Sequence, residues 1–243
     1  MPNSVEMLIR KLDSIADLTS EDRQSLSSLP LRIVELHPDQ DFARSEDVPR
    51  ECCLVIEGFM HRYQNLANGT RQILAFHIPG DIPDLQSLML DVMDHNLAAL
   101  VPCKVGIVSH ASLHEVMRKS PGVARAFWRY TLIDAAMFRE RITSVGRRSA
   151  HVRLAHLLCE TFTRLRAVGL TAEDACWLPF TQTQLSDALG LSTVHVNRTL
   201  MQLRAEGTFE LRKSRLNILD WKGLAKAAQF DSAYLHLRRP ASD

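Results

Sequence analysis

Several features that would assign this chain to a specialised class of protein are missing from it. No apolar run approaches the roughly 18 residues that a membrane-spanning helix needs, and residues 1–6 lack the basic-then-apolar pattern of a signal peptide. The five cysteines include no CxxC pair, which argues against a disulfide framework and against a zinc site built from cysteine pairs. We therefore expect a cytoplasmic globular protein that does not contact a membrane.

A strong net charge is also absent. The formal net charge is +1 over 243 residues, so the overall charge does not identify a nucleic-acid-binding protein. The local distribution is less even, because the segment from Arg139 to Arg166 holds seven arginines but only two acidic residues, Glu140 and Glu160. This stretch fits an electrostatic footprint for a polyanion, and it fits solvated helix faces equally well.

The histidines do not form the pattern of a metal site. Those at close spacing are His110 with His114 and His151 with His156. No nearby set of carboxylates or cysteines completes either pair into a tetrahedral site. His61 and His77 fall on expected strands, but the closely spaced histidine pair of a cupin-like metal enzyme is missing. We expect no catalytic residue and no metal ligand, so the chain is not expected to be an enzyme; a cupin-like metal enzyme is the alternative.

The first half of the chain shows short strand patterns separated by turn signals. After helical spacing within residues 5–29, Asn68-Gly69 and Pro79-Gly80-Asp81 mark tight turns. The expected strands are residues 31–36, 52–58, 59–64, 71–76, 97–101 and 103–108. Many short strands of this kind predict a small antiparallel barrel or jelly roll rather than a parallel sheet.

A long helical segment follows Ser120-Pro121. Its apolar residues recur at spacings of three, four, three and four: Val123, Ala126, Tyr130, Ile133 and Met137. This spacing is that of a coiled-coil seam, which predicts a homodimer joined along the helix. The alternative is a single amphipathic helix that packs on its own domain.

The segment from Phe180 to Leu219 has four parts in a diagnostic order. A short helical pattern over 181–189 ends at Gly190, and a second helical pattern runs from Ser192, a good N-cap, to Ala205. Two strand patterns then flank the basic tip Arg212-Lys213-Ser214-Arg215. Two helices joined by a glycine turn are typical of a helix-turn-helix unit, and the basic hairpin is typical of a wing.

Side chains near the start of the second helix are expected to reach DNA bases. We assign base reading to Thr193, Val194, Asn197 and Arg198. Arginine binds guanine through two hydrogen bonds, whereas valine can only touch a thymine methyl group. Contacts with the phosphate backbone, which position the protein but do not specify sequence, are assigned to Thr181, Ser192, His195, Arg212 and Lys213.

These patterns together predict an α+β protein in four segments. The expected fold has an N-terminal antiparallel β-roll, a long dimerisation helix and a C-terminal winged helix-turn-helix domain. The expected boundaries are 1–115 for the N-terminal helices and β-roll, 116–146 for the long helix, 147–225 for the winged domain and 226–243 for a tail.

The sequence resembles the Crp/Fnr family of bacterial transcription regulators over nearly its whole length. The segments that carry the resemblance are Leu54–Gly58, Asn68–Phe76, Pro79–Asp81 and Gly190–Arg198. The resemblance implies a β-roll that receives an effector and a dimer that binds double-stranded DNA. It also implies activation or repression of transcription, often through contact with RNA polymerase.

Departures from the family pattern argue against its known cofactors. Members that bind cyclic AMP hold the cyclic phosphate with an arginine after the glycine turn, but Asp94–Leu97 contains none. Iron–sulfur members carry an N-terminal cysteine cluster, whereas the first cysteine here is Cys52. Haem members have a histidine shortly after the turn, and Ile82–Gln86 has none. We expect no iron–sulfur cluster, no haem and no cyclic AMP, with an effector of unknown identity.

Two further expectations concern the signal and the DNA. A small-molecule effector is expected beside the strand face, the turn and the long helix, at Phe76, Gly80, Asp81, Leu85 and Tyr130. Many family members have glutamate where this chain has Val194, so a departure from the usual family half-site is expected. The alternative to effector control is a constitutive regulator whose β-roll is a ligand-free dimerisation scaffold.

Overall fold

The computed structural model describes residues 5–238, so the ends of the first and last expected segments, 1–4 and 239–243, lie outside the described residues. Contacts divide the chain into two units, which we treat separately. The first comprises the residues up to Gln64, Leu74–Ala135 and the residues from His236, and the second comprises Asn65–Ile73 and Ala136–Leu235. Within residues 5–238, no helix has both the length and the apolar character required to cross a bilayer.

The N-terminal part of the chain forms an antiparallel β-roll, as the sequence predicted. Three strands pair in the order β1-β7-β3 and four in the order β2-β6-β4-β5. The strands are β1 (Arg32–Leu36), β2 (Asp41–Ala43), β3 (Glu51–Glu57), β4 (Met60–Asn65), β5 (Arg71–His77), β6 (Asn96–Ala99) and β7 (Cys103–Ser109). The helices are α1 (Glu6–Asp13), α2 (Ser20–Ser27), the 3-10 turn η1 (Leu85–Leu88), α3 (His110–Lys119) and α4 (Pro121–Arg147).

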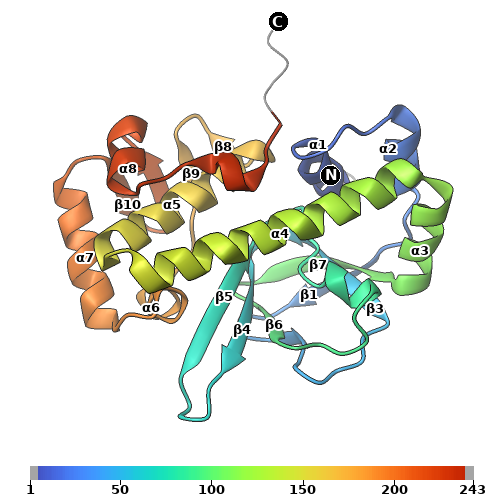
Figure 1. Ribbon diagram of the computed structural model, residues 1–243, viewed down its shortest axis with the longest axis horizontal. Coiled ribbons are helices and arrows are strands. Elements are labelled where there is room, and N and C mark those ends of the chain that lie inside the picture. The colour runs from blue at the N-terminus through green and yellow to red at the C-terminus, as the bar shows by residue number, and fades with distance from the viewer. Residues whose placement is uncertain (1–4, 239–243) are drawn as a thin grey trace, which may run out of the picture. The chain divides into compact units, whose positions relative to one another are not determined.

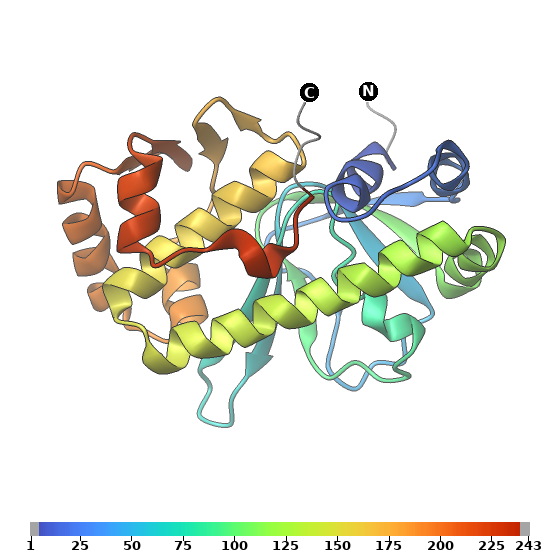
Figure 2. The ribbon, with the colours of Figure 1, turned by 45° about the horizontal axis from the view of Figure 1, so that its top comes forward.

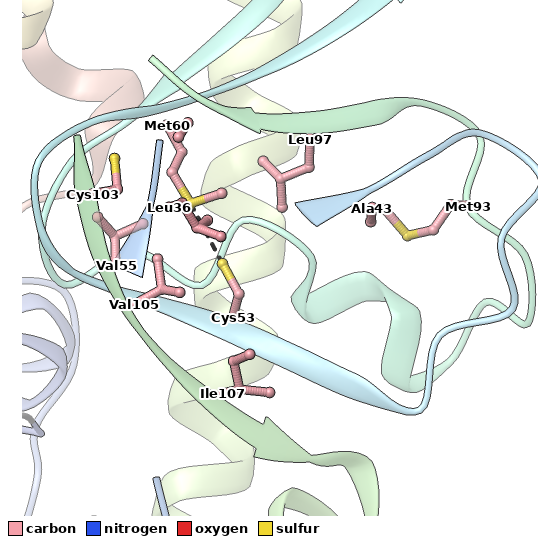
Figure 3. Packing of buried hydrophobic residues seen from close by; sticks show 11 residues of the cluster. Leu36, Ala43, Cys53, Val55, Met60, Met93, Leu97, Cys103, Val105 and Ile107 are labelled. Carbon is pink, nitrogen blue, oxygen red and sulfur yellow. Dashed lines mark hydrogen bonds between the residues drawn. The ribbon is translucent and has the colours of Figure 1, made fainter. Parts of the chain in front are cut away.

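Apolar side chains from both sheets meet inside the roll (Figure 3). Strands β3, β6 and β7 contribute alternate residues to this cluster because side chains of a strand point to opposite faces in turn. The cluster consists of Leu36, Ala43, Cys53, Val55, Met60, Met93, Leu97, Ala99, Cys103, Val105 and Ile107. The thiol of Cys53 lies 3.5 Å from the sulfur of Met60. Burial raises the pKa of Cys53 well above its usual range, so this thiol is a core residue rather than a reactive group.

Helix α4 begins at Pro121, where the Ser120-Pro121 pattern predicted a long helix, and not at the expected segment boundary of 116, because residues 110–119 form the separate helix α3. Proline has no N–H to donate within a preceding helix but suits a first helical position, and Pro121 accordingly opens α4. The helix buries one apolar face in its own chain. Val123, Ala126, Tyr130 and Ile133 are each at most 9% exposed.

The expected dimer seam is therefore wrong for Val123, Ala126, Tyr130 and Ile133, because these side chains are buried within their own chain. The alternative, a helix that packs on its own domain, describes them. A coiled-coil spacing marks an apolar stripe but does not say what covers it. Met137, the fifth expected seam residue, is half-buried. A second stripe on α4 is exposed, and it contains Trp128 and Leu132.

The glycine turn after β5 packs tightly against α1. Gly80 has a φ of +95°, and a side chain there would approach the carbonyl oxygen of Met7 to 2.6 Å. The carboxylate of Asp81 accepts a hydrogen bond from the N–H of Ile78 (3.0 Å) and pairs with the ammonium group of Lys11 (3.0 Å). These contacts fix α1 over the turn.

The second unit contains a winged helix-turn-helix domain, whose residues 150–235 are coloured yellow to red in Figure 1. Its helices are α5 (Ala150–Ala167), α6 (Gln182–Leu189), α7 (Thr193–Ala205), α8 (Trp221–Ala227) and the 3-10 turn η2 (Ser232–Leu235). Its strands are β8 (Thr171–Ala172), β9 (Ala175–Trp177), β10 (Phe209–Arg212) and β11 (Arg215–Ile218), paired in the order β10-β11-β9-β8. Strands β8 and β9, which extend the wing into a four-stranded sheet, were not predicted from the sequence, and neither was η2 in the expected tail.

Most arginines of the basic stretch are engaged inside this unit. Arg141 donates to the buried carboxylate of Glu160 (3.2 Å), and the hydroxyl of Tyr234 donates to the same carboxylate (2.8 Å). Burial alone would raise the pKa of Glu160, but Arg141 and Arg164 outweigh it and the pKa is lowered. Arg153 donates to the carbonyl oxygen of Val145 (2.9 Å). The basic stretch is thus mainly an internal ion-pair and hydrogen-bond network rather than a footprint for DNA.

The packing of α1 on the glycine turn yields a paired prediction. We expect Gly69→Ala to cost about 1–2 kcal/mol, the usual penalty of a left-handed backbone for a residue with a Cβ, because Gly69 has a φ of +81° and open space around it. Gly80→Ala should cost clearly more, since its methyl group would also collide with Met7. Urea unfolding of the two variants compares the costs. Equal losses would contradict the close approach of α1.

Candidate nucleic-acid interface

Helix α6 is held at both ends by local hydrogen bonds. The Thr181 hydroxyl accepts from the N–H of Gln184, whose side-chain oxygen in turn accepts from the N–H of Thr181 (2.9 Å). This capping box satisfies two amide donors that a helix start leaves free. At the other end Gly190, with a φ of +62°, turns the chain out of the helix, a conformation that glycine adopts without strain.

Helix α7 starts at the predicted N-cap and buries one face. The hydroxyl of Ser192 accepts a hydrogen bond from the N–H of His195 (3.2 Å). Val196, Leu200 and Leu203 are buried, and α7 packs on α5 and α6. Thr199 is also buried, although an apolar residue would be expected there; its hydroxyl donates to the carbonyl oxygen of His195 (2.8 Å), which satisfies the polar group within the helix.

The opposite face of α7 is exposed and carries all four residues assigned to base reading. Thr193, Val194, Asn197 and Arg198 lie together around a shallow hollow of about 530 Å³. Val194 is 79% exposed, which is unusual for an apolar side chain without a partner. The hollow therefore provides a mixed apolar and hydrogen-bonding surface on the second helix of the motif.

Three more residues line this hollow that were not selected from the sequence. Met201 and Gln202 follow Arg198 by about one turn of α7, so helical periodicity could have identified them. Gln182 belongs to α6, and only the fold brings it to the same surface. Its side-chain oxygen accepts a hydrogen bond from the Asn197 amide (3.2 Å).

The wing is a two-residue hairpin between β10 and β11. Lys213 and Ser214 both have a positive φ, 48° and 60°, which is the requirement of the type I′ turn that matches strand twist. The side chain of Arg212 is 83% exposed. The tip thus presents two cations to solvent, as a phosphate-binding wing requires.

The remaining residues assigned to phosphate have structural roles as well. Thr181 and Ser192 use their hydroxyl oxygens as helix caps. Their hydroxyl hydrogens are still able to bond a phosphate oxygen, because a hydroxyl both donates and accepts. His195 is half-buried, whereas Thr193 and Val194 before it are exposed, so His195 is less accessible to DNA than these two residues.

Of the expected effector residues, Gly80, Asp81 and Tyr130 lie next to α1, which occupies part of the space beside them. The Tyr130 hydroxyl accepts from the N–H of Ile82 (3.2 Å), and the Lys11 ammonium lies 5.6 Å from the centre of the Tyr130 ring. Asp81 pairs with Lys11 as described above. Phe76 is buried. Leu85 instead lines a separate apolar hollow of about 240 Å³, together with other residues of η1 and of the first half of α4. Figure 2 shows the ribbon of η1 beside α4.

An arginine does lie inside the β-roll, on β4 rather than in the segment where a cyclic-AMP-binding arginine would be expected. The guanidinium of Arg62 donates to Asp134 of α4 (2.9 Å) and to the carbonyl oxygen of Pro83. Next to it, Asp84 is fully buried and accepts a hydrogen bond from the N–H of Cys53 (3.0 Å). Burial raises the pKa of Asp84 to about 7.

One histidine of each closely spaced pair has another partner. His110 lies 3.0 Å from the hydroxyl of Ser87, and His151 lies 2.5 Å from a carboxylate oxygen of Glu206. Across the described part of the chain, no three histidine, cysteine or acidic side chains come together in a way that could hold a metal ion.

Comparison with known proteins agrees with this arrangement. A cyclic nucleotide-binding domain matches residues 33–120, and a Crp-like helix-turn-helix domain matches residues 152–227. The nitrogen fixation regulation protein FixK of Bradyrhizobium diazoefficiens is 27% identical over 72% of this chain and 73% of its own length. The transcriptional activator protein FnrL of Cereibacter sphaeroides is 26% identical over 73% of each chain.

A solved structure has the same fold. The structure of FixK2 from Bradyrhizobium japonicum matches 82% of this chain and 98% of its own, with a TM-score of 0.73 and 24% sequence identity. The order of β-roll, long helix and winged domain is therefore a shared architecture.

The buried carboxyl group of Asp84 makes stability depend on pH. Its pKa is about 7 in the fold against an ordinary value of 3.8, so the fold favours the protonated form. The Asp84 carboxyl group therefore makes its full favourable contribution to the free energy of unfolding below about pH 4. This contribution, at most about 4 kcal/mol, is lost as the pH rises toward 7. Asp84→Asn keeps an oxygen for the Cys53 N–H and cannot ionise. The stability of Asp84→Asn relative to the unsubstituted protein should therefore rise between pH 4 and 7 and level off above, as measured by urea unfolding. A constant difference across this range would contradict a raised pKa.

Proposed function

Because this chain belongs to the Crp/Fnr family of DNA-binding transcription regulators, we propose that it binds an inverted-repeat site as a homodimer and controls transcription in the cytoplasm. The observation that carries the proposal is the exposed face of α7, on which Asn197 and Arg198 stand beside the apolar Val194. A two-fold dimer would present two such faces to major grooves one helical turn apart, about 34 Å. Contact with RNA polymerase, through which regulators of this kind often act, is part of the proposal.

We place the dimer contact on the exposed stripe of α4. Trp128, Leu132, Ile142 and Val145 are 68%, 55%, 73% and 37% exposed. Ala135 and Arg139 lie between Leu132 and Ile142 on the same side of the helix. Positions 128, 132, 135, 139, 142 and 145 are therefore spaced by four, three, four, three and three residues, which makes one continuous stripe along the helix. A two-fold contact between copies uses the same surface on both subunits, and an apolar stripe of this kind suits a second copy of α4.

Apolar residues next to η1 extend the same surface. Met89, Leu90 and Val92 are each more than half exposed, and Met89 and Leu90 line the 240 Å³ hollow together with Trp128. A contiguous group of exposed apolar side chains on a monomer indicates an interaction site. We propose that the partner's α4 region covers it.

Selection of DNA from a random pool with the purified protein tests the function. The expected result is an enriched inverted repeat that binds at least about 10³-fold tighter than a scrambled control, as specific regulators typically do. Enrichment of a single half-site would count against binding as a dimer. So would the enrichment of no sequence, both with the purified protein alone and with cell extract added.

The signal that we propose is not cyclic AMP. The segment Asp94–Leu97 offers no arginine for a cyclic phosphate, and the interior Arg62 is already paired with Asp134. Any effector must bind two conformations of the dimer with different affinity. Constitutive DNA binding is the second candidate, and the packing of α1 beside Gly80 and Asp81 favours it. If no added metabolite changes the affinity for DNA, the constitutive candidate is supported.

Ile142→Glu should shift the protein from dimer to monomer. A carboxylate in the middle of an apolar contact would have to be desolvated without a partner. Thr143→Glu is the matched control, because Thr143 is also exposed on α4 but lies one residue off the stripe. Sedimentation velocity at a micromolar concentration distinguishes the two. A dimeric Ile142→Glu protein would place the contact elsewhere.

Arg198→Ala should weaken binding to the selected repeat by about 5- to 150-fold, the value of a bidentate contact with guanine, and leave binding to scrambled DNA nearly unchanged. Replacing Arg212 and Lys213 by alanine should weaken binding to the selected repeat and to scrambled DNA equally. It should also reduce the slope of log affinity against log salt by about 0.9 for each phosphate that is no longer neutralised. Fluorescence anisotropy at several salt concentrations measures both effects. Equal losses on both DNAs for Arg198→Ala would remove the base-reading assignment.

A further inference from the structure

A hydrogen bond joins the two helices of the motif on the DNA-facing surface. The side-chain nitrogen of Asn197, on α7, donates to the side-chain oxygen of Gln182, the first residue of α6, over 3.2 Å. Both side chains are exposed, and both line the 530 Å³ hollow. The bond therefore restrains a side chain at the place where a base edge would lie.

The groups that this bond leaves unused match one base. An amide side chain has one acceptor oxygen and two N–H donors. With one N–H given to Gln182, Asn197 keeps its oxygen and one N–H. Adenine presents an acceptor, N7, and a donor, N6, in the major groove, so one donor and one acceptor on the protein are what it requires. Guanine presents two acceptors there and does not match.

The apolar neighbours fit the other half of the same base pair. Val194 lies one turn before Asn197 on α7, and Met201 lies one turn after it; they are 79% and 65% exposed. The thymine opposite an adenine carries a methyl group in the major groove, and apolar side chains are its usual contacts. Arg198, the next residue along, is suited to guanine.

We propose that Gln182 is a positioning residue that holds Asn197 for adenine, so that the Gln182–Asn197 pair specifies an A·T base pair beside the guanine read by Arg198. This inference rests on the proposed function. Gln182 is assigned a positioning role because its oxygen accepts the hydrogen bond from Asn197; its own N–H donors have no partner within the described part of the chain, so the double variant below separates this role from a direct contact with DNA. Fixing the amide before DNA binds lowers the entropy that the contact costs.

The test uses the selected repeat and a set of DNAs in which each position of the half-site is replaced in turn by the other three bases. Binding is measured by anisotropy for the unsubstituted protein, Gln182→Ala, Asn197→Ala, the double variant, Gln182→Glu and Thr183→Ala. Thr183 is the matched control, since it is exposed on the first turn of α6 next to Gln182. Thermal unfolding of each variant checks that it is folded.

For the unsubstituted protein we expect one position with a preference for adenine of about 5- to 150-fold. Asn197→Ala should abolish that preference, and Gln182→Ala should reduce it severalfold. The double variant should match Asn197→Ala alone, because Gln182 acts only through Asn197. Gln182→Glu keeps the acceptor oxygen, so it should retain the preference while its charge weakens binding to every DNA. Thr183→Ala should change neither.

Two results would overturn the inference while leaving the proposed function intact. One is an unchanged base preference in a Gln182→Ala protein that is specific, folded and dimeric. The other is a loss for Gln182→Ala that is equal on all DNAs, which would make Gln182 a backbone contact. Failure of the unsubstituted protein to prefer the selected repeat over the scrambled control would instead contradict the proposed function itself.

Discussion

Burial of one face of α7 is the constraint on which the proposed DNA-reading surface depends. Val196, Leu200 and Leu203 cannot be exposed without a cost of about 1.5–3 kcal/mol each, so they fix the rotation of the helix about its axis. Once that rotation is fixed, Val194, Asn197 and Arg198 have to point outward, because residues on opposite sides of a helix cannot both be buried on one core. The caps at Thr181 and Ser192 then set where each helix starts.

A buried polar network holds α5, the helix on which α7 packs. Glu160 is buried with Arg141 and Tyr234 around it, so the charge of the carboxylate is compensated where water is excluded. Removing one member of such a network leaves an uncompensated buried charge, whereas the intact network specifies one arrangement of α5 against the end of α4. The arginines that look like a basic surface in the sequence thus mainly serve the fold, and the exposed cations that we assign to DNA phosphate are those of the wing.

The two apolar stripes of α4 differ in burial. The stripe at Val123, Ala126, Tyr130 and Ile133 completes the core of the chain itself. The stripe that starts at Trp128 and Leu132 is exposed, and it is the one on which we propose the dimer contact. Both follow a spacing of three and four residues, since a helix of 3.6 residues per turn repeats any stripe at this interval. Periodicity therefore identified the helix, but it could not identify which stripe was free.

Local patterns in the sequence were sufficient for most of the secondary structure and for much of the site. Turn residues such as Asn68-Gly69, the capping residue Thr181 and the glycine at 190 act on their immediate neighbours, so their effect can be predicted without the fold. The four residues that we assign to base reading follow from the period of one helix. What only the tertiary structure decided are contacts between residues distant in sequence: α1 over the Gly80 turn, Arg62 bonded to Asp134, and Gln182 beside Asn197. Each depends on how elements pack in three dimensions, which no spacing along the chain encodes.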